Sequence, residues 1–122
     1  MKVYGIKNCN SVKKALEFLD KKALEFDFID IKKIDLGVLE NWLKYKRFSE
    51  IINTAGTTSK KLGLNKDKIE SLSELELKNI ILENPSCIKR PVIEKDNQIY
   101  IGKEYEQILL FYLLKDDSFF QS

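Results

Sequence analysis

Two spacings of apolar residues divide the chain into three parts. In the first part, Val3, Tyr4 and Ile6 predict a short strand, and alternating apolar and polar residues predict a second strand at 26–31. The residues between these strands have the spacing of an amphipathic helix ending near Lys21, with apolar positions at Val12, Ala15, Leu16 and Leu19. The first part is therefore a strand–helix–strand unit, in which we expect parallel strands joined by a right-handed crossover.

The middle part, residues 35–83, shows helical spacing and no strand pattern. Helices are predicted at 36–43 and 48–52, followed by a polar loop at 53–58. No linker-like stretch flanks this part of the chain. We therefore expect a helical insertion that packs on the sheet within a single domain spanning 1–122.

The last helix of this insertion has clear start and stop signals. Ser73 is the expected N-cap, and Glu76, three residues later, completes a capping box. Helical spacing continues through Leu82, and Asn84-Pro85 is expected to stop the helix.

The final part returns to strands. Residues 91–95 and 98–101 flank the two-residue loop 96–97, an Asp-Asn pair that tolerates positive φ, which predicts an antiparallel hairpin. Gly102 then leads into a helix expected at 104–114. The order β-α-β, helical insertion, β-β-α predicts an α/β, thioredoxin-like fold with a mixed four-stranded sheet. In that arrangement the junction after the first strand is the reactive corner.

Cys9 lies at this junction, among residue types that suit a turn and a helix N-cap: Asn8, Asn10 and Ser11. The first free N–H groups and the positive end of the helix dipole favour a thiolate over a thiol. Three nearby lysines add positive charge: Lys7, Lys13 and Lys14. The same N–H groups, those of Asn10 and Ser11, would hold an oxyanion beside the sulfur, so the loop that begins at Asn8 is a candidate for both nucleophile and anion pocket. A small buried thiol that serves packing alone is the alternative.

Composition narrows the classes of function. The chain has 122 residues, 43% hydrophobic and 33% charged, as a globular domain does, and its formal net charge of +2 is too small to predict nucleic-acid binding. The N-terminus lacks the apolar core of a signal peptide, so a cytoplasmic location is expected. The longest apolar run, 108–114, is far shorter than the roughly 20 residues of a membrane-spanning helix, and no membrane association is expected.

The chain contains no histidine and only two cysteines, Cys9 and Cys87. This excludes Ser-His-Asp and Cys-His catalytic arrangements and the common zinc sites, so no metal site is expected. If Cys9 is activated, backbone N–H groups and cations must provide the activation.

Arg90-Pro91 precedes the predicted hairpin. Because proline lacks a donor for the sheet, Pro91 is expected at the first residue of the strand or in a bend, with a cis bond as one option. In a thioredoxin-like layout this bend would lie next to the Cys9 loop, and Arg90 would offer planar, bidentate recognition of an oxyanion or carboxylate. A solvent-exposed arginine without a role is the alternative.

Together these stretches resemble the ArsC/Spx family over about residues 2–114. The resemblance rests on five pieces of sequence: Tyr4 to Ala15, Asn53 to Thr58, Asn84-Pro85, Ile88 to Pro91, and the Gly102 before the last helix. It implies a thioredoxin-like fold with a helical insertion. Known relatives include glutaredoxin-coupled arsenate reductases, glutathione-dependent thiol reductases and Spx-type transcription regulators. By this resemblance Cys9 matches the nucleophilic cysteine, and Arg90 matches the arginine that contacts the bound oxyanion or the surroundings of the cysteine.

Three positions depart from the family pattern. Arsenate reductases of the family carry a further arginine in the 53–56 loop, where Ala55 stands at what looks like that position. A third family arginine, near the start of the last helix, is unmatched at 101–103, although Lys103 supplies a charge there. Val12 replaces the second cysteine of the Cys-x-x-Cys switch of many Spx regulators. One preorganised donor to an oxyanion is typically worth about 2.7 to 4 kcal/mol. The loss of two family arginines therefore favours a thiol substrate over arsenate.

The sequence thus predicts a thiol-dependent oxidoreductase in which the Cys9 thiolate attacks an oxyanion, a disulfide or a glutathionylated substrate. We expect no bound cofactor, and glutathione or glutaredoxin as the reductant and partner. The alternative is a non-catalytic, Spx-type regulator that binds RNA polymerase. A third possibility is a protein in which Cys9 is inert. Cys87 is either a resolving thiol or, in the simpler interpretation, a packing residue.

Overall fold

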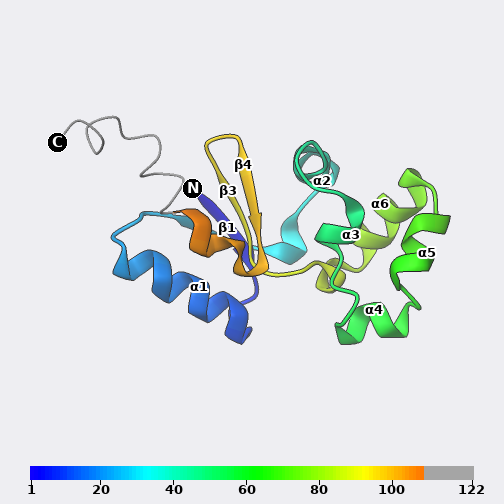
Figure 1. Ribbon diagram of the computed structural model, residues 1–122, viewed down its shortest axis with the longest axis horizontal. Coiled ribbons are helices and arrows are strands. Elements are labelled where there is room, and N and C mark those ends of the chain that lie inside the picture. Colours follow the sequence, from blue (N-terminus) through cyan, green and yellow to red (C-terminus); the bar gives the residue numbers. More distant parts are fainter. Residues whose placement is uncertain (109–122) are drawn as a thin grey trace.

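The fold was analysed in a computed structural model, which describes residues 1–108. Its centre is a four-stranded sheet with the order β2-β1-β3-β4 (Figure 1). Strand β1 (Lys2–Gly5) pairs in parallel with β2 (Asp27–Asp30) and antiparallel with β3 (Val92–Lys95). Strand β3 in turn pairs antiparallel with β4 (Gln98–Ile101). The predicted mixed sheet and the thioredoxin-like α/β arrangement are confirmed.

The sheet buries an apolar layer on each face because residues of β1 alternate between the two. Val3 packs with Leu19 of α1 (Asn10–Lys21) and with Ile93, whereas Tyr4 packs with Trp42 in the larger cluster formed by the insertion. The Tyr4 and Trp42 rings meet edge to face, with centroids 5.2 Å apart. Figure 1 shows α1 on one side of the sheet and the helices of the insertion on the other.

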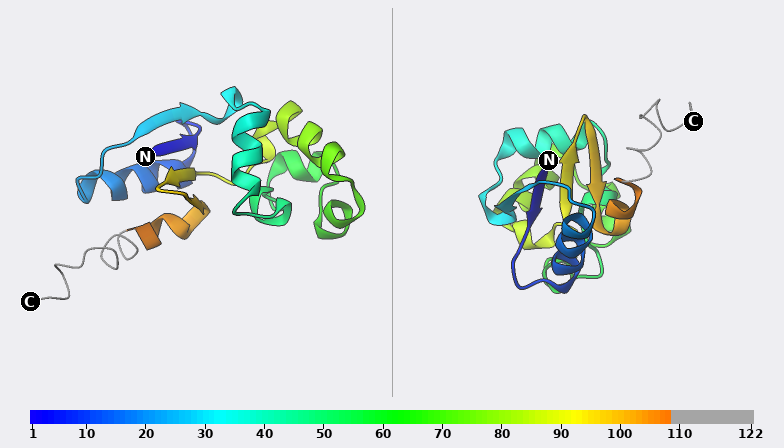
Figure 2. Two further views of the ribbon diagram at one scale, coloured as in Figure 1. Left: turned by 90° about the horizontal axis from the view of Figure 1, so that it is seen from above. Right: turned by 90° about the vertical axis from the view of Figure 1, so that its left-hand side faces the viewer.

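The insertion forms a cluster of short helices at one end of the molecule (Figure 2). Its elements are η1 (Ile31–Lys33), α2 (Leu36–Leu43), α3 (Phe48–Ile51), α4 (Thr57–Lys61), α5 (Lys66–Ser71), α6 (Glu74–Glu83) and η2 (Pro85–Cys87). The start of α6 is as predicted, because the Ser73 hydroxyl accepts a hydrogen bond from the Glu76 N–H at 3.1 Å. The helix ends at Glu83, directly before Asn84-Pro85.

Two helices of the insertion were not predicted. The polar loop expected at 53–58 is shorter than predicted because α4 begins at Thr57, and α5 follows at Lys66. Each of these helices buries a single side chain, Ser59 and Ile69 respectively. With so few apolar positions, neither helix has a readable periodicity.

The hairpin has the turn that its sequence predicts. Asp96 and Asn97 adopt φ angles of 48° and 61° between β3 and β4. After β4 the chain enters the 3₁₀ turn η3 (Gly102–Glu106) at Gly102, which has a φ of 63°. The helix expected at 104–114 therefore begins differently, with a 3₁₀ turn, and most of the predicted range lies outside the described residues. Within residues 1–108, no helix has the length and apolar character needed to cross a membrane.

Candidate functional site

Cys9 occupies the N-cap of α1, immediately after a tight turn from β1. Its N–H donates to the Ile6 carbonyl at 3.2 Å, and its carbonyl accepts from the Lys13 N–H at 3.0 Å. Gly5 allows this close approach, because a Cβ at that position would lie 2.8 Å from Cγ2 and 3.0 Å from Cγ1 of Val12. The end of β1 and the first turn of α1 are therefore in direct contact, and Cys9 is held between them with a half-buried side chain.

The environment of Cys9 favours the thiolate. Partial burial by itself would raise the pKa of the Cys9 thiol, but the Val12 N–H, the Arg90 guanidinium and the Ser11 N–H together lower that pKa below its ordinary value. The N-cap position explains which amides act, because an N-cap side chain faces the N–H groups two and three residues on. The amides are those of Ser11 and Val12, so the expectation for Ser11 is confirmed and that for Asn10 is wrong.

Arg90 is the cation that acts on the sulfur, through a hydrogen bond and through its charge. The lysines at 7, 13 and 14 are solvent-exposed, where water and salt screen their charge. The Arg90 side chain is half-buried, and its Nη1 donates to the Ser86 carbonyl at 3.0 Å. Its Nε is buried and has no hydrogen-bond partner among the described residues. A guanidinium held in this way retains donor capacity for a bound anion.

Pro91 fixes the bend that brings Arg90 to Cys9. The Arg90–Pro91 peptide bond is cis, and Pro91 is buried immediately before β3. The Pro91 carbonyl accepts a hydrogen bond of 2.9 Å from the Gly102 N–H, which ties the bend to the turn after β4. The start of α1, this bend and η3 consequently meet at one corner of the fold.

A cleft of about 380 Å³ opens at this corner. It is lined by residues from four regions, namely Cys9, Ser11 and Lys14; Asn53; Lys89 and Arg90; and residues 101–105. Four of these side chains are cationic (Lys14, Lys89, Arg90 and Lys103), and one, Glu104, is acidic. Asn8 and Asn10 are exposed and are not among the lining residues, so the structure does not bring their side chains to the cleft. The arrangement suits a nucleophilic sulfur beside an anionic ligand.

Comparison with known proteins places this site in a family. Residues 4–111 match the sequence profile of the ArsC family. The chain belongs to the ArsC family. This ArsC protein is 35% identical over 109 residues to an uncharacterized protein of Haemophilus influenzae, covering 85% of this chain and 94% of the relative.

Two further comparisons point to reductases and to regulators. The chain is 31% identical over 109 residues to the global transcriptional regulator Spx of Streptococcus agalactiae, covering 85% of this chain and 77% of the regulator. It also resembles the crystal structure of a possible arsenate reductase from Streptococcus mutans, with a TM-score of 0.75 and 33% identity over 88% of this chain and 95% of that one. This ArsC protein is thus similar both to a protein described as a possible arsenate reductase and to an Spx regulator.

The ArsC loop after α3 presents Asn53 to the cleft, whereas Ala55, the position singled out from the sequence, is exposed and lines a neighbouring groove. The Asn53 N–H donates to the Cys87 carbonyl at 2.8 Å, and its Oδ1 accepts from the Ala55 N–H at 3.2 Å. An isolated bridge between Ile52 and Ile88 aligns this loop with the segment before Arg90. Because that bridge joins distant segments, no local sequence signal identifies Asn53.

Cys87, the second thiol of this ArsC chain, is 1% exposed and is not among the residues that line the cleft. Burial raises its pKa to about 11 despite its own backbone N–H and the nearby charge of Arg90. Cys87 is therefore a protonated thiol at neutral pH, chemically distinct from Cys9. Among residues 1–108, no group of three or more His, Cys, Asp or Glu side chains is arranged to hold a metal ion.

Proposed function

We propose that this protein is a monothiol oxidoreductase that reduces glutathionylated thiols, with glutathione or glutaredoxin as the reductant. The observation that carries the proposal is the Cys9 sulfur itself, whose pKa is lowered by the Ser11 and Val12 amides and by Arg90 at the edge of a cationic cleft. The thiolate is the form that attacks disulfides. Free thiols of this kind persist in a reducing compartment, which supports action in the cytoplasm.

The reaction takes place in two thiol–disulfide exchanges. The Cys9 thiolate attacks the glutathione sulfur of the mixed disulfide, a bond forms between the two sulfurs, and the substrate leaves as a thiolate that takes up a proton. A second glutathione, as its thiolate, then attacks the Cys9–glutathione disulfide. Glutathione disulfide leaves, and the Cys9 thiolate is regenerated. In the net reaction one glutathione thiol and the mixed disulfide give the free substrate thiol and glutathione disulfide, so one glutathione is oxidised for each substrate thiol released.

The charges of the cleft support glutathione over a small oxyanion. Glutathione carries two carboxylates, and the cleft offers lysines at Lys14, Lys89 and Lys103 in addition to Arg90. Lysine binds carboxylates as a point charge, whereas tight recognition of a tetrahedral oxyanion favours several planar, bidentate guanidinium groups. A cleft with three lysines and a single arginine is therefore better suited to a flexible peptide ligand than to arsenate.

Steady-state turnover tests this proposal. The wild-type protein is assayed with a glutathionylated peptide plus glutathione, and separately with arsenate plus glutathione and glutaredoxin. We expect turnover of the peptide, a loss of at least about 100-fold in Cys9→Ser, and retained turnover in the matched variant Cys87→Ala. The proposal would be contradicted if the wild-type protein turned over arsenate but not the glutathionylated peptide. It would also be contradicted if Cys9→Ser and wild type were equally active on the peptide.

The relationship to Spx favours a second candidate, a regulator that binds RNA polymerase. Its support is the 31% identity to the Streptococcus agalactiae regulator. Val12 removes the possibility of a Cys-x-x-Cys disulfide at Cys9, so such a regulator would not switch through that motif. Binding to purified RNA polymerase, measured for the wild type and for Cys9→Ala, separates the two candidates. Equal, saturable binding by both proteins without any turnover would favour the regulator.

A further inference from the structure

Among residues 1–108, Glu104 is the only acidic residue that lines the Cys9 cleft. It belongs to η3, next to Lys103, and its side chain is 35% exposed. An unpaired carboxylate at this place would repel an anionic ligand and offset the neighbouring lysines. Neutralising Glu104 would therefore strengthen the attraction of the cleft for an anion.

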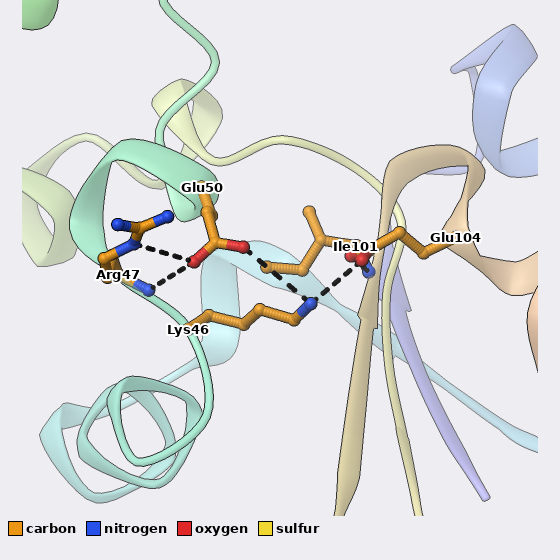
Figure 3. A network of polar contacts seen from close by, with 5 residues as sticks. All are labelled: Lys46, Arg47, Glu50, Ile101 and Glu104. Atoms are coloured by element: carbon orange, nitrogen blue, oxygen red, sulfur yellow. Dashed lines mark hydrogen bonds and ion pairs between the residues drawn. The ribbon is translucent and has the colours of Figure 1, made fainter.

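Lys46 provides that neutralisation from the insertion. Its Nζ lies 2.9 Å from Glu104 Oε2, and Figure 3 shows the ammonium group between the carboxylates of Glu104 and Glu50. The Lys46 side chain is only 16% exposed, so solvent screens this ion pair less than an ordinary surface pair. The other Glu104 oxygen, Oε1, accepts a hydrogen bond of 2.9 Å from the Ile101 N–H.

Arg47 keeps Lys46 available for Glu104. The contact from Lys46 Nζ to Glu50 Oε2 is longer, at 3.9 Å. Glu50 Oε1 instead accepts from the Arg47 N–H at 3.0 Å and from Arg47 Nε at 3.4 Å. That backbone hydrogen bond is the main reason why the pKa of Glu50 is lowered. Glu50 thus has closer partners in Arg47, and the shorter ion pair of Lys46 is the one with Glu104.

We propose that Lys46 is a charge-masking and positioning residue for the Cys9 cleft, although it does not itself line the cleft. By pairing with Glu104 it removes the negative charge from the wall of the cleft and ties η3, with Lys103, to the insertion. This inference rests on the proposed function in one respect, which is that the ligand is anionic, as glutathione is. It concerns the affinity of the cleft for an anion and not the reactivity of Cys9.

The inference is tested by a binding measurement that needs no turnover. S-methylglutathione, which cannot form a disulfide, and sulfate are titrated as protectants of Cys9 against iodoacetamide at pH 7. The proteins are wild type, Lys46→Met, Glu104→Gln and the double variant. Lys44→Met is the control, because Lys44 is exposed and its loss changes the net charge equally.

Charge masking predicts an asymmetric result. Lys46→Met should weaken protection by S-methylglutathione about fivefold to thirtyfold, the range for one uncovered charge about 8 Å away at an effective dielectric constant between about 20 and 40. Glu104→Gln and the double variant should bind within about twofold of wild type or more tightly, because the repelling charge is gone. Lys44→Met should resemble wild type, and protection in each protein is expressed relative to its own rate of Cys9 modification without ligand.

Other outcomes overturn the inference. If Lys46→Met and Glu104→Gln weaken protection equally, the pair is a structural tie and masks no charge. Failure of both anions to protect the wild-type protein would also refute it. Urea unfolding of each variant shows whether a change in protection reflects loss of the fold. The proposed oxidoreductase activity fails or stands separately, because it is judged by turnover of Cys9→Ser and not by protection.

Discussion

Gly5→Ala is the substitution that most directly tests how the fold positions Cys9. The new Cβ would lie 2.8 Å and 3.0 Å from the two methyl groups of Val12, which is completely buried. A valine side chain is short and stiff, so it cannot move aside, and the first turn of α1 must shift away from β1. Such overpacking typically costs about 1 to 3 kcal/mol. Loss of glycine flexibility in the unfolded chain returns about 0.4 to 1 kcal/mol, leaving a net destabilisation of about 0 to 2.6 kcal/mol.

The same shift should be visible at Cys9. Because the Val12 and Ser11 N–H groups lower the pKa of Cys9, moving the first turn should raise that pKa and slow iodoacetamide modification at pH 7. Truncating the clashing side chain in Gly5→Ala/Val12→Ala should restore the modification rate. Its free energy of unfolding should exceed the additive value from the single variants, by about 0.5 to 3 kcal/mol.

Urea unfolding and the modification rate are measured on the same preparations. Gly37→Ala is the control, because that glycine lies in α2 and a Cβ there would meet only Asp35 Oδ1, at 3.3 Å. It should leave the Cys9 rate unchanged. If Gly5→Ala is as stable as wild type and its Cys9 is modified as fast, the contact between β1 and α1 does not position the thiolate.

Three further predictions concern the cleft and the buried thiol. Arg90→Ala should raise the Cys9 pKa, which is measured by thiolate absorbance, and Arg90→Lys should restore part of the wild-type pKa. The free energy of unfolding in urea should change by about 1 kcal/mol or less. An unchanged pKa would mean that Arg90 has a structural role only. Asn53→Arg should strengthen sulfate protection of Cys9 more than Ala55→Arg does, because only Asn53 lines the cleft; the reverse order would contradict the structure. Since burial raises the Cys87 pKa to about 11, its stabilising contribution is complete below about pH 8.5 and is lost as pH rises toward 11. Wild type should therefore lose about 1.5 kcal/mol more stability than Cys87→Ala between about pH 8.5 and 10 in urea melts, and parallel curves would refute this.

Elements with strong local signals could be predicted from the sequence, and elements that depend on distant contacts could not. The helix after Cys9 and the turn at Asp96 and Asn97 each follow from a pattern of neighbouring residues, and both are confirmed. The proximity of Arg90 to Cys9 was inferred only through the topology expected of the fold. Asn53 escaped notice because its position depends on the bridge between Ile52 and Ile88.

The ion pair between Lys46 and Glu104 shows why part of the site is invisible in the sequence. The two residues are 58 positions apart, in unrelated elements, and lysines and glutamates are common throughout the chain. Neither residue has a local pattern that distinguishes it from its solvent-exposed counterparts. The role of the ion pair can be inferred only when the cleft and its charges have been located in the structure.

The contacts of Asn53 and Lys46 show that the helical insertion contributes to the Cys9 cleft as well as packing on the sheet. The strand–helix unit supplies Cys9, the proposed nucleophile, and the bend before β3 supplies Arg90, but the insertion reaches the same cleft through Asn53 and, indirectly, through Lys46. Because the amides that stabilise the thiolate belong to α1, substitutions in the insertion alter the ligand side of the cleft while leaving the source of nucleophilicity in place. Substrate preference can therefore diverge between proteins of this fold through residues of the insertion, with the chemistry at Cys9 unchanged.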